Sequence, residues 1–423
     1  KNKKSVKRTY AYDAQNQLLS ETIGSDTTSY TYDTAGNIRS ITGPGVSKSF
    51  SYDDTGDWKD LLTSVTVNGT TRSITYEEEN GVTIGNPLSY FNGTQYTLAW
   101  QNGRQLASLS GGGKSATYTY GADGIRTGKT VTDASGTTTY QYTTQNGQIA
   151  RQSWTAGGTA YQMDFIYDAA GKTLALYYRV KLPNSNEYSG DSYYYETNQQ
   201  GDVTGLYKIT YNATTKALSA TRVASYEYDA WGNVTYSTGT MAKINPLKYR
   251  GYYHDAETGF YYLQSRYYDP AIGRFINADD EKTIFNALSD YESSDGLNGI
   301  SYLDHNQFAY CLNNPINMSD DEGDWSVAIF STIISFGAAL PLAPVVAVIA
   351  ISLAVVAAYQ GYRIYAARHR SHGKKGRPEL KRQGTEPLEK KKGDDKKWVK
   401  RSGKKPRSQP RPHHPSKRGH RKY

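Results

Sequence analysis

The chain has 423 residues, a net charge of +9 and a single cysteine, Cys311, which excludes an internal disulfide framework and a cysteine-ligated metal cluster. Its 37% of hydrophobic residues make it too polar for a polytopic membrane protein, and its 13% of aromatic residues exclude disorder throughout. Tyrosine is the most unusual residue: its 39 copies, beside 40 glycines, favour short strands and tight turns. Because the chain begins at Lys1 without Met or a signal peptide, we expect it to be the C-terminal part of a longer protein.

An aromatic repeat runs through residues 1–240. Blocks such as YAYDAQNQ, YTYDTAGN and YEYDAWGN recur about every 20–25 residues. The second aromatic position of each block, with Leu98 as a substitution, falls at Tyr12, Tyr32, Tyr52, Tyr76, Leu98, Tyr120, Tyr142, Tyr167, Tyr195 and Tyr228. Two rings at alternate positions lie on one face of a strand, and Asp-x-x-Gly or Asn-Gly then closes a turn. Each block therefore predicts a β-hairpin that must stack on its neighbours to bury its rings.

This pattern resembles the YD repeat of the bacterial RHS family. The resemblance covers about 240 residues and ten copies. It implies a spiralled β-shell that encloses a C-terminal passenger. The individual tyrosines and glycines are interpreted as scaffold.

The next segment, 241–323, is a dense run of rings and turns. Its central part reads NPLKYRGYYHDAETGFYYLQSRYYDPAIGRFINADD. Arg250, Arg266 and Arg274 recur among the rings, and each buried guanidinium needs a carboxylate or hydroxyl partner. The run closely resembles the RHS repeat-associated core domain, with its Tyr249-Arg250-Gly251 and Arg266-Tyr267-Tyr268-Asp269-Pro270 motifs.

In many members of that family the core is an aspartyl autoprotease that cuts just after a D-P-x-G motif. The resemblance implies that Asp279 and Asp320 form the carboxylate pair, with Arg274 as a neighbouring cation. Two close carboxylates can share a proton, so that one acts as base and the other as acid. Here 320–323 reads DDEG in place of D-P-x-G, and Asp280 replaces the first proline. The alternative is that both aspartates cap turns.

From Ser326 to Gln360 the chain carries no charged residue. Pro341 and Pro344 divide this stretch, and proline is accepted at the start of a helix but not inside it. We therefore predict helices over about 326–340 and 344–367. The second has about 17 uncharged residues, the lower limit for crossing a bilayer, so a transmembrane helix or other membrane contact is expected through 326–360. A packed domain core and an apolar passenger are the alternatives.

Residues 368–423 form a basic tail. They hold 22 Lys and Arg and 5 Asp and Glu, a net charge of +17, whereas the rest of the chain carries −8. The density of Pro, Arg and Lys predicts a largely disordered tail that binds phosphates of nucleic acid or anionic lipid without sequence preference. Nuclease activity, with His420 as an acid or base, is one hypothesis, and a solvated tail without catalysis is the alternative.

These observations divide the chain into 1–240, 241–323, 324–367 and 368–423. The predicted fold class is mainly β: stacked hairpins forming a curled sheet or shell, then a helical apolar segment and a disordered basic tail. The resemblance implies a secreted or cell-surface shell protein of the polymorphic-toxin type. Such a protein delivers a toxic passenger in competition between bacteria and has an immunity protein as partner. The alternative is a non-toxic surface protein that binds cell-wall carbohydrate. No cofactor or metal is predicted.

Overall fold

The protein is known from a computed structural model that describes residues 6–56, 58–279, 306–320, 323 and 327–328. All of these belong to the first of two compact units, Lys1–Ile333. Within them the secondary structure is antiparallel sheet, with two 3-10 turns, η1 (Tyr249–Gly251) and η3 (Cys311–Asn313). The prediction of a mainly β fold is confirmed for this part of the chain.

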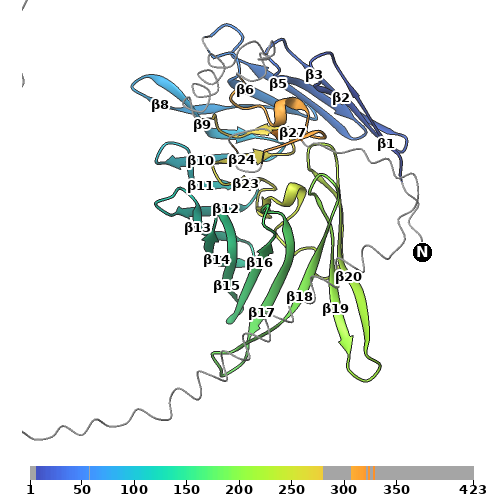
Figure 1. Ribbon diagram of the computed structural model, residues 1–423. Coiled ribbons are helices and arrows are strands. Elements are labelled where there is room, and N and C mark those ends of the chain that lie inside the picture. The colour runs from blue at the N-terminus through green and yellow to red at the C-terminus, as the bar shows by residue number, and fades with distance from the viewer. Residues whose placement is uncertain (1–5, 57, 280–305, 321–322, 324–326, 329–423) are drawn as a thin grey trace, which may run out of the picture. The chain divides into compact units, whose positions relative to one another are not determined.

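The repeats form two sheets in which each strand pairs with its neighbours in sequence (Figure 1). The first sheet contains β1 (Arg8–Tyr12), β2 (Leu18–Ile23), β3 (Asp26–Tyr32), β4 (Ile38–Gly43), β5 (Val46–Tyr52), β6 (Leu62–Val67) and β7 (Thr70–Ser73). The second contains β8 (Thr75–Glu79), β9 (Val82–Phe91), β10 (Gln95–Gln101), β11 (Gln105–Gly111), β12 (Lys114–Tyr120), β13 (Arg126–Asp133), β14 (Gly136–Gln145), β15 (Gln148–Ala156), β16 (Thr159–Tyr167), β17 (Thr173–Lys181), β18 (Tyr188–Thr197), β19 (Val203–Asn212), β20 (Ala217–Tyr228) and β21 (Val234–Thr238). We call β1–β21 the repeat sheets. Sequential pairing of this kind is what stacked hairpins require.

In six of the repeats the second aromatic residue fastens its hairpin to the one before it. Tyr52 ends β5, and its hydroxyl donates to the Ile38 carbonyl, 2.9 Å away, at the start of β4. Equivalent bonds of 2.7–2.9 Å join Tyr32 to Leu18, Tyr76 to Leu62, Tyr120 to Leu106, Tyr167 to Ile149 and Tyr228 to Val203. The ring is packed while its hydroxyl is satisfied, which explains tyrosine rather than phenylalanine at this position.

The aspartate after this tyrosine closes the turn. Asp33 Oδ1 accepts the backbone N–H groups of Ala35 and Asn37, both at 2.9 Å. The same pair of bonds is made by Asp13, Asp168, Asn198 and Asp229. These residues act as scaffold, in agreement with the interpretation of the repeat from sequence.

The register of some hairpins differs from the sequence prediction. The pairing of β10 with β11 shifts just before Trp100, as it shifts just before the repeat tyrosine in β3 and β5. Trp100 therefore takes the tyrosine position that sequence analysis gave to Leu98, and its Nε1 donates to the Pro87 carbonyl at 2.7 Å. Thr144 and Thr197 take the same position in β14 and β18. Alternate residues share a face, so a two-residue offset leaves the apolar pattern unchanged.

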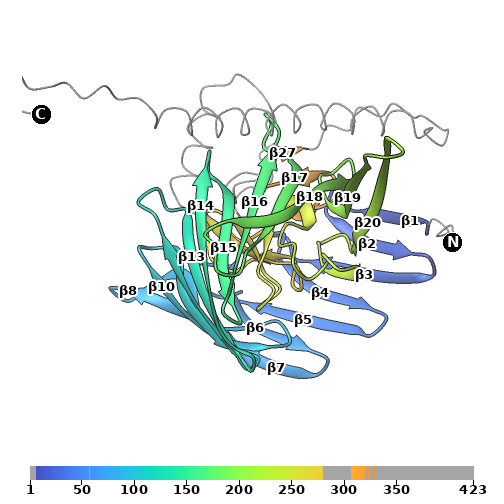
Figure 2. The same cartoon turned by 90° about the horizontal axis from the view of Figure 1, so that it is seen from below.

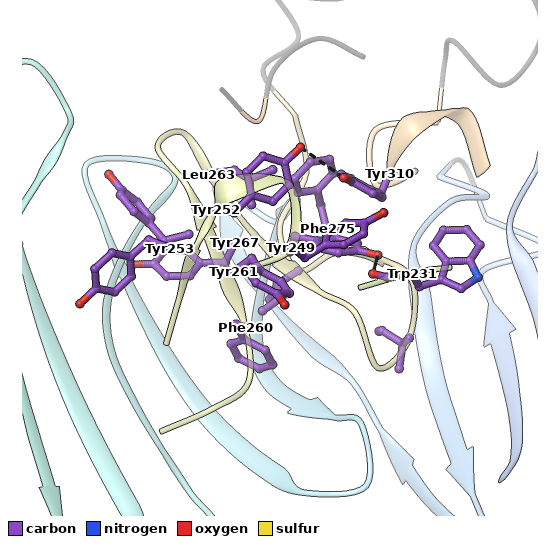
Figure 3. Close-up of a cluster of buried hydrophobic side chains, with 14 of the residues drawn as sticks. Trp231, Tyr249, Tyr252, Tyr253, Phe260, Tyr261, Leu263, Tyr267, Phe275 and Tyr310 are labelled. Atoms are coloured by element: carbon purple, nitrogen blue, oxygen red, sulfur yellow. Dashed lines mark hydrogen bonds between the residues drawn. The ribbon is translucent and has the colours of Figure 1, made fainter. Parts of the chain in front are cut away.

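The core segment, residues 241–279 and 306–320, packs its aromatic rings against the repeat sheets. It contains a small sheet of β22 (Tyr253–His254), β23 (Tyr261–Leu263), β24 (Arg266–Asp269) and β25 (Arg274–Phe275). Figure 2 shows it, in yellow and orange, between the strands of the two repeat sheets. Within this segment a hydroxyl bond joins Tyr252 to Tyr310, while the ring of Trp231 from the last repeat packs edge-on against Tyr30 of β3 (Figure 3). Three successive carbonyls of the last repeat turn accept tyrosine hydroxyls: Ala230 from Tyr249, Trp231 from Tyr268 and Gly232 from Tyr261.

An ion network anchors the core segment to the second repeat sheet. Arg126, on β13, is fully buried and binds Asp255 through two bonds of 2.7 and 3.0 Å. Lys129 Nζ lies 2.8 Å from Asp255 and 2.8 Å from Glu257. Burial alone would raise the pKa of the Asp255 carboxyl, but the two cations outweigh it and hold that pKa below its ordinary value. Five rings surround the guanidinium, with centroids 4.3–5.9 Å from its carbon atom: Tyr118, Tyr142, Tyr253, Tyr262 and Tyr267.

The first and last repeats meet at Glu21 on β2, which is buried. Its Oε2 accepts the Ala230 N–H at 2.8 Å, and its Oε1 lies 3.4 Å from Arg8 Nη1. Arg8 also donates to the Tyr228 carbonyl. Burial raises the pKa of the Glu21 carboxyl to about 7, although the Ala230 N–H and Arg8 oppose the shift. The contact between the two ends of the repeat array therefore contains a group that titrates near neutrality.

We expect the free energy of unfolding to fall as pH rises from 4.5 to about 7. In that window the folded chain holds the Glu21 proton and the unfolded chain does not, so the loss reaches about 3 kcal/mol at most. Glu21→Gln keeps an acceptor for Ala230 but does not titrate. Thermal unfolding of both proteins at about pH 5 and pH 8 tests this, because the wild type should lose more stability than the variant. Equal losses would contradict it.

The apolar stretch 326–360 enters the described structure only at Val327–Ala328. These residues form β27, which pairs with β26 (Met318–Ser319), and the prediction of a helix over 326–340 is wrong at these positions. Pairing with an adjacent strand satisfies the backbone groups that a helix would pair internally. No helix in the described part of the chain is long and apolar enough to cross a membrane. The rest of 324–367, and the whole tail 368–423, lie outside the described residues.

Candidate functional site

Arg266 connects the two aspartates that the sequence singled out. It lies on β24, is 3% exposed, and places its guanidinium carbon 3.6 Å from the centre of the Phe275 ring. Its Nη2 is 2.8 Å from Asp279 Oδ2 and 3.5 Å from Asp320 Oδ2. The two carboxylate oxygens therefore lie no farther apart than the sum of these distances. The structure therefore brings Asp279 and Asp320 together around one guanidinium group.

The other nitrogens of Arg266 bind backbone carbonyls. Nε donates to the Gly323 carbonyl oxygen, and Nη1 donates to the Gln307 carbonyl at 3.0 Å. The Gly323 N–H in turn donates to Asp320 Oδ1 at 2.7 Å. Asp320 thus does cap a turn, which was the alternative interpretation, and it also faces Arg266. A cation bonded to the Gly323 oxygen withdraws electron density from that carbonyl and would stabilise negative charge developing there.

Gly323 occupies a place where no side chain would fit. Its φ is +83°, and a Cβ would lie 2.6 Å from the Leu263 carbonyl oxygen and 2.8 Å from Ser265 Oγ. Both the backbone conformation and the close approach to β23 require glycine. The glycine of the terminal motif is therefore what allows the Gly323 carbonyl to reach Arg266.

Each aspartate is held by further contacts. The Asp279 N–H donates to the Gln307 carbonyl at 3.1 Å, and its Oδ1 lies 3.2 Å from Arg104 Nη1. The Asp320 N–H donates to the Tyr252 hydroxyl at 3.0 Å. A pocket of about 700 Å³ gives solvent a route to Asp279. Its lining includes Asp279, Trp58, Arg104, Tyr120, Ser265 and Gln307.

Arg274, the cation that sequence analysis placed beside the aspartates, lies elsewhere. Its Nη2 donates to the Asp60 carbonyl at 2.9 Å, and its guanidinium lies over the rings of Tyr52 and Phe308. It joins the core segment to the first repeat sheet. The sequence identified Arg266 as a buried arginine in need of a partner but gave no signal for its choice of partner. His420 lies outside the described residues.

Across the described residues no three His, Cys, Asp or Glu side chains gather in a group that could hold an ion. In the described part of the chain, the site contains two carboxylates and the guanidinium groups of Arg266 and Arg104. The arrangement suits acid–base chemistry on the bound carbonyl.

The hairpins held by Tyr and Asp, packed around a tyrosine-rich core segment, define the class: a β-repeat protein with an internal aromatic core. The family model described as RHS Repeat matches residues 12–45. This match agrees with the sequence resemblance to the RHS-repeat family.

The curated relatives include bacterial tRNA nucleases. The chain is 30% identical over 235 residues to the tRNA3(Ser)-specific nuclease WapA of Bacillus spizizenii, and 30% identical over 250 residues to the tRNA nuclease WapA of Bacillus subtilis. Each alignment covers 55% of this chain, which spans only 8% of the length of either relative. Among solved structures, TcdB2-TccC3-TEV aligns with 75% of this chain and 17% of its own, at 17% identity and a TM-score of 0.46.

Proposed function

We propose that this chain is the shell-forming part of an RHS-type toxin, which carries a C-terminal passenger and releases it by cutting itself after Gly323. The observation that carries the proposal is that one buried guanidinium, Arg266, binds the Gly323 carbonyl and both aspartates at once. Bound peptide carbonyl, cation and two carboxylates are the parts that aspartyl hydrolysis of a peptide bond needs. The relationship to WapA nucleases supports a toxin role.

The proposed reaction consumes one water molecule. One carboxylate takes a proton from the water, whose oxygen attacks the Gly323 carbonyl carbon. Arg266 stabilises the negative charge that develops on the carbonyl oxygen. The bond to the nitrogen of residue 324 then breaks, and the second carboxyl group gives its proton to that nitrogen. The water is divided between a new carboxylate and a new amine.

Incubation of the purified full chain tests the proposal. It should release a fragment of about 100 residues, 324–423, whose mass and N-terminal sequence place the cut after Gly323. A chain that stays intact over hours across acidic and neutral pH would contradict self-cleavage. Release from another bond would reject Gly323 as the site.

The same proposal extends to the biological setting. We place the protein in the secreted or cell-surface class, with an immunity protein that protects the producing cell from the passenger. The +17 tail would then be the part that meets nucleic acid or anionic lipid, because counterion release favours such contacts. Under this proposal, the immunity protein binds the released fragment 324–423 and inhibits it.

A second candidate function, glycan binding, is favoured by one observation. The rings of Tyr140, Trp154, Tyr161 and Tyr178 form a partly exposed row with neighbouring centroids 5.3–6.1 Å apart. Three of them are nearly parallel and stack on one another, and a partly exposed cluster of aromatic rings is apolar surface against which a sugar ring would pack. Titration of cell-wall glycan fragments should change tryptophan fluorescence in the wild type but not in Trp154→Ala. No change in either protein would remove this candidate.

A further inference from the structure

Arg104 joins the repeat sheets to Asp279. It follows the Asn102-Gly103 turn between β10 and β11 and points a guanidinium nitrogen, Nη1, at Asp279 Oδ1, 3.2 Å away. Arg266 of the core segment holds the other oxygen of the same carboxylate at 2.8 Å. Asp279 thus lies between one cation of the repeats and one of the core, and both oxygens are fixed.

The same region of the repeats also holds the backbone next to Asp279. The Ala278 N–H donates to the Gly85 carbonyl on β9 at 3.2 Å. Gly85 has a φ of +76°, and a Cβ there would lie 2.5 Å from Ala278 Cβ, so the contact depends on glycine. Asn86 ties β9 to the turn that carries Arg104, because its Nδ2 donates to the Gly103 carbonyl at 2.6 Å.

We propose that Arg104 is a positioning residue for self-cleavage: it holds Asp279 in place from the repeat sheets, so that cutting proceeds only after β9–β11 have folded against the core segment. This inference rests on the proposed function. In the proposed reaction Asp279, which two guanidinium groups hold, is then assigned as the base, and Asp320 as the group that supplies the proton. Among the described residues, Arg104, Arg266 and Asp320 are charged groups that face Asp279, and Asp123 lines the same pocket.

The experiment compares self-cleavage rates of the full chain in the wild type, Arg104→Gln and Arg104→Lys across pH. Arg104→Gln should cut about 10- to 100-fold more slowly, because a misplaced base is costly to catalysis. Its rate should also begin to rise at a higher pH than in the wild type, since Asp279 without its neighbouring cation protonates more readily. Arg104→Lys keeps the charge and should restore most of the rate and the wild-type pH profile.

Arg151→Gln is the matched control, since Arg151 also sits on a repeat strand and pairs with an aspartate, Asp164, but lies far along the sheet from Arg104. It should cut at the wild-type rate. An Arg104→Gln protein with the wild-type rate and pH profile would overturn the inference, as would a rate lowered equally at every pH, which indicates structural damage alone. A wild type that never cuts would instead overturn the proposed function.

Discussion

Asp279→Asn and Asp320→Asn should each leave the chain intact under conditions in which the wild type releases residues 324–423. An amide can neither take the proton from water nor return one to the leaving nitrogen, and general acid–base catalysis contributes about 10²- to 10⁴-fold to a rate. Asparagine has nearly the same size and shape as aspartate, so each substitution disturbs the packing around Arg266 as little as possible. Intact-mass measurement over time gives the rate for each variant.

Asp164→Asn is the control for this pair of variants. Asp164 is likewise an aspartate held by arginine, through contacts with Arg151 and Arg179, but it lies on a repeat strand. This variant should cut at the wild-type rate. Cleavage of Asp279→Asn or Asp320→Asn at the wild-type rate would show that the aspartates only cap turns. The hydrogen bond from the Gly323 N–H to Asp320 already fulfils that role.

Arg126→Met should destabilise the protein more than any change to a surface ion pair. The substitution leaves the Asp255 carboxylate fully buried with only part of its compensating charge, from Lys129. Removing one partner of a buried ion pair lowers the free energy of unfolding by about 3–5 kcal/mol. The substitution also removes the two hydrogen bonds that join β13 to the core segment. Denaturation in guanidinium chloride, followed by tryptophan fluorescence, should show an earlier midpoint.

Two further variants give this prediction its control. Arg151→Met breaks an exposed pair with Asp164, for which the expected loss is about 1 kcal/mol or less. Arg126→Lys retains the charge but cannot form two parallel bonds with Asp255, so its midpoint should fall between those of the wild type and Arg126→Met. A midpoint for Arg126→Met no lower than that of Arg151→Met would contradict a role for the network in stability.

Local order in this protein was readable from the sequence. The repeat tyrosine and the aspartate before the turn form hydrogen bonds with residues close in the chain. The Tyr52 hydroxyl donates to the Ile38 carbonyl of the preceding hairpin, and Asp33 accepts the N–H groups of Ala35 and Asn37. Each block of about 20 residues therefore carries the information for its own hairpin. The expectation that Asp279 and Asp320 act together came only from family resemblance, since nothing local links the two residues.

Only the tertiary structure decided which partners meet across long separations. Arg266 and Arg274 lie in the same core segment, both buried among rings, and composition allows either to join the aspartates. The choice depends on which distant segment packs against each arginine. Arg266 donates hydrogen bonds to the carbonyls of Gln307 and Gly323, whereas Arg274 donates to the carbonyl of Asp60. Tertiary structure also decides the strand at Val327–Ala328, because this segment forms backbone pairs with β26. The sequence determines the hairpins through neighbouring residues, and the packing of distant segments determines the site.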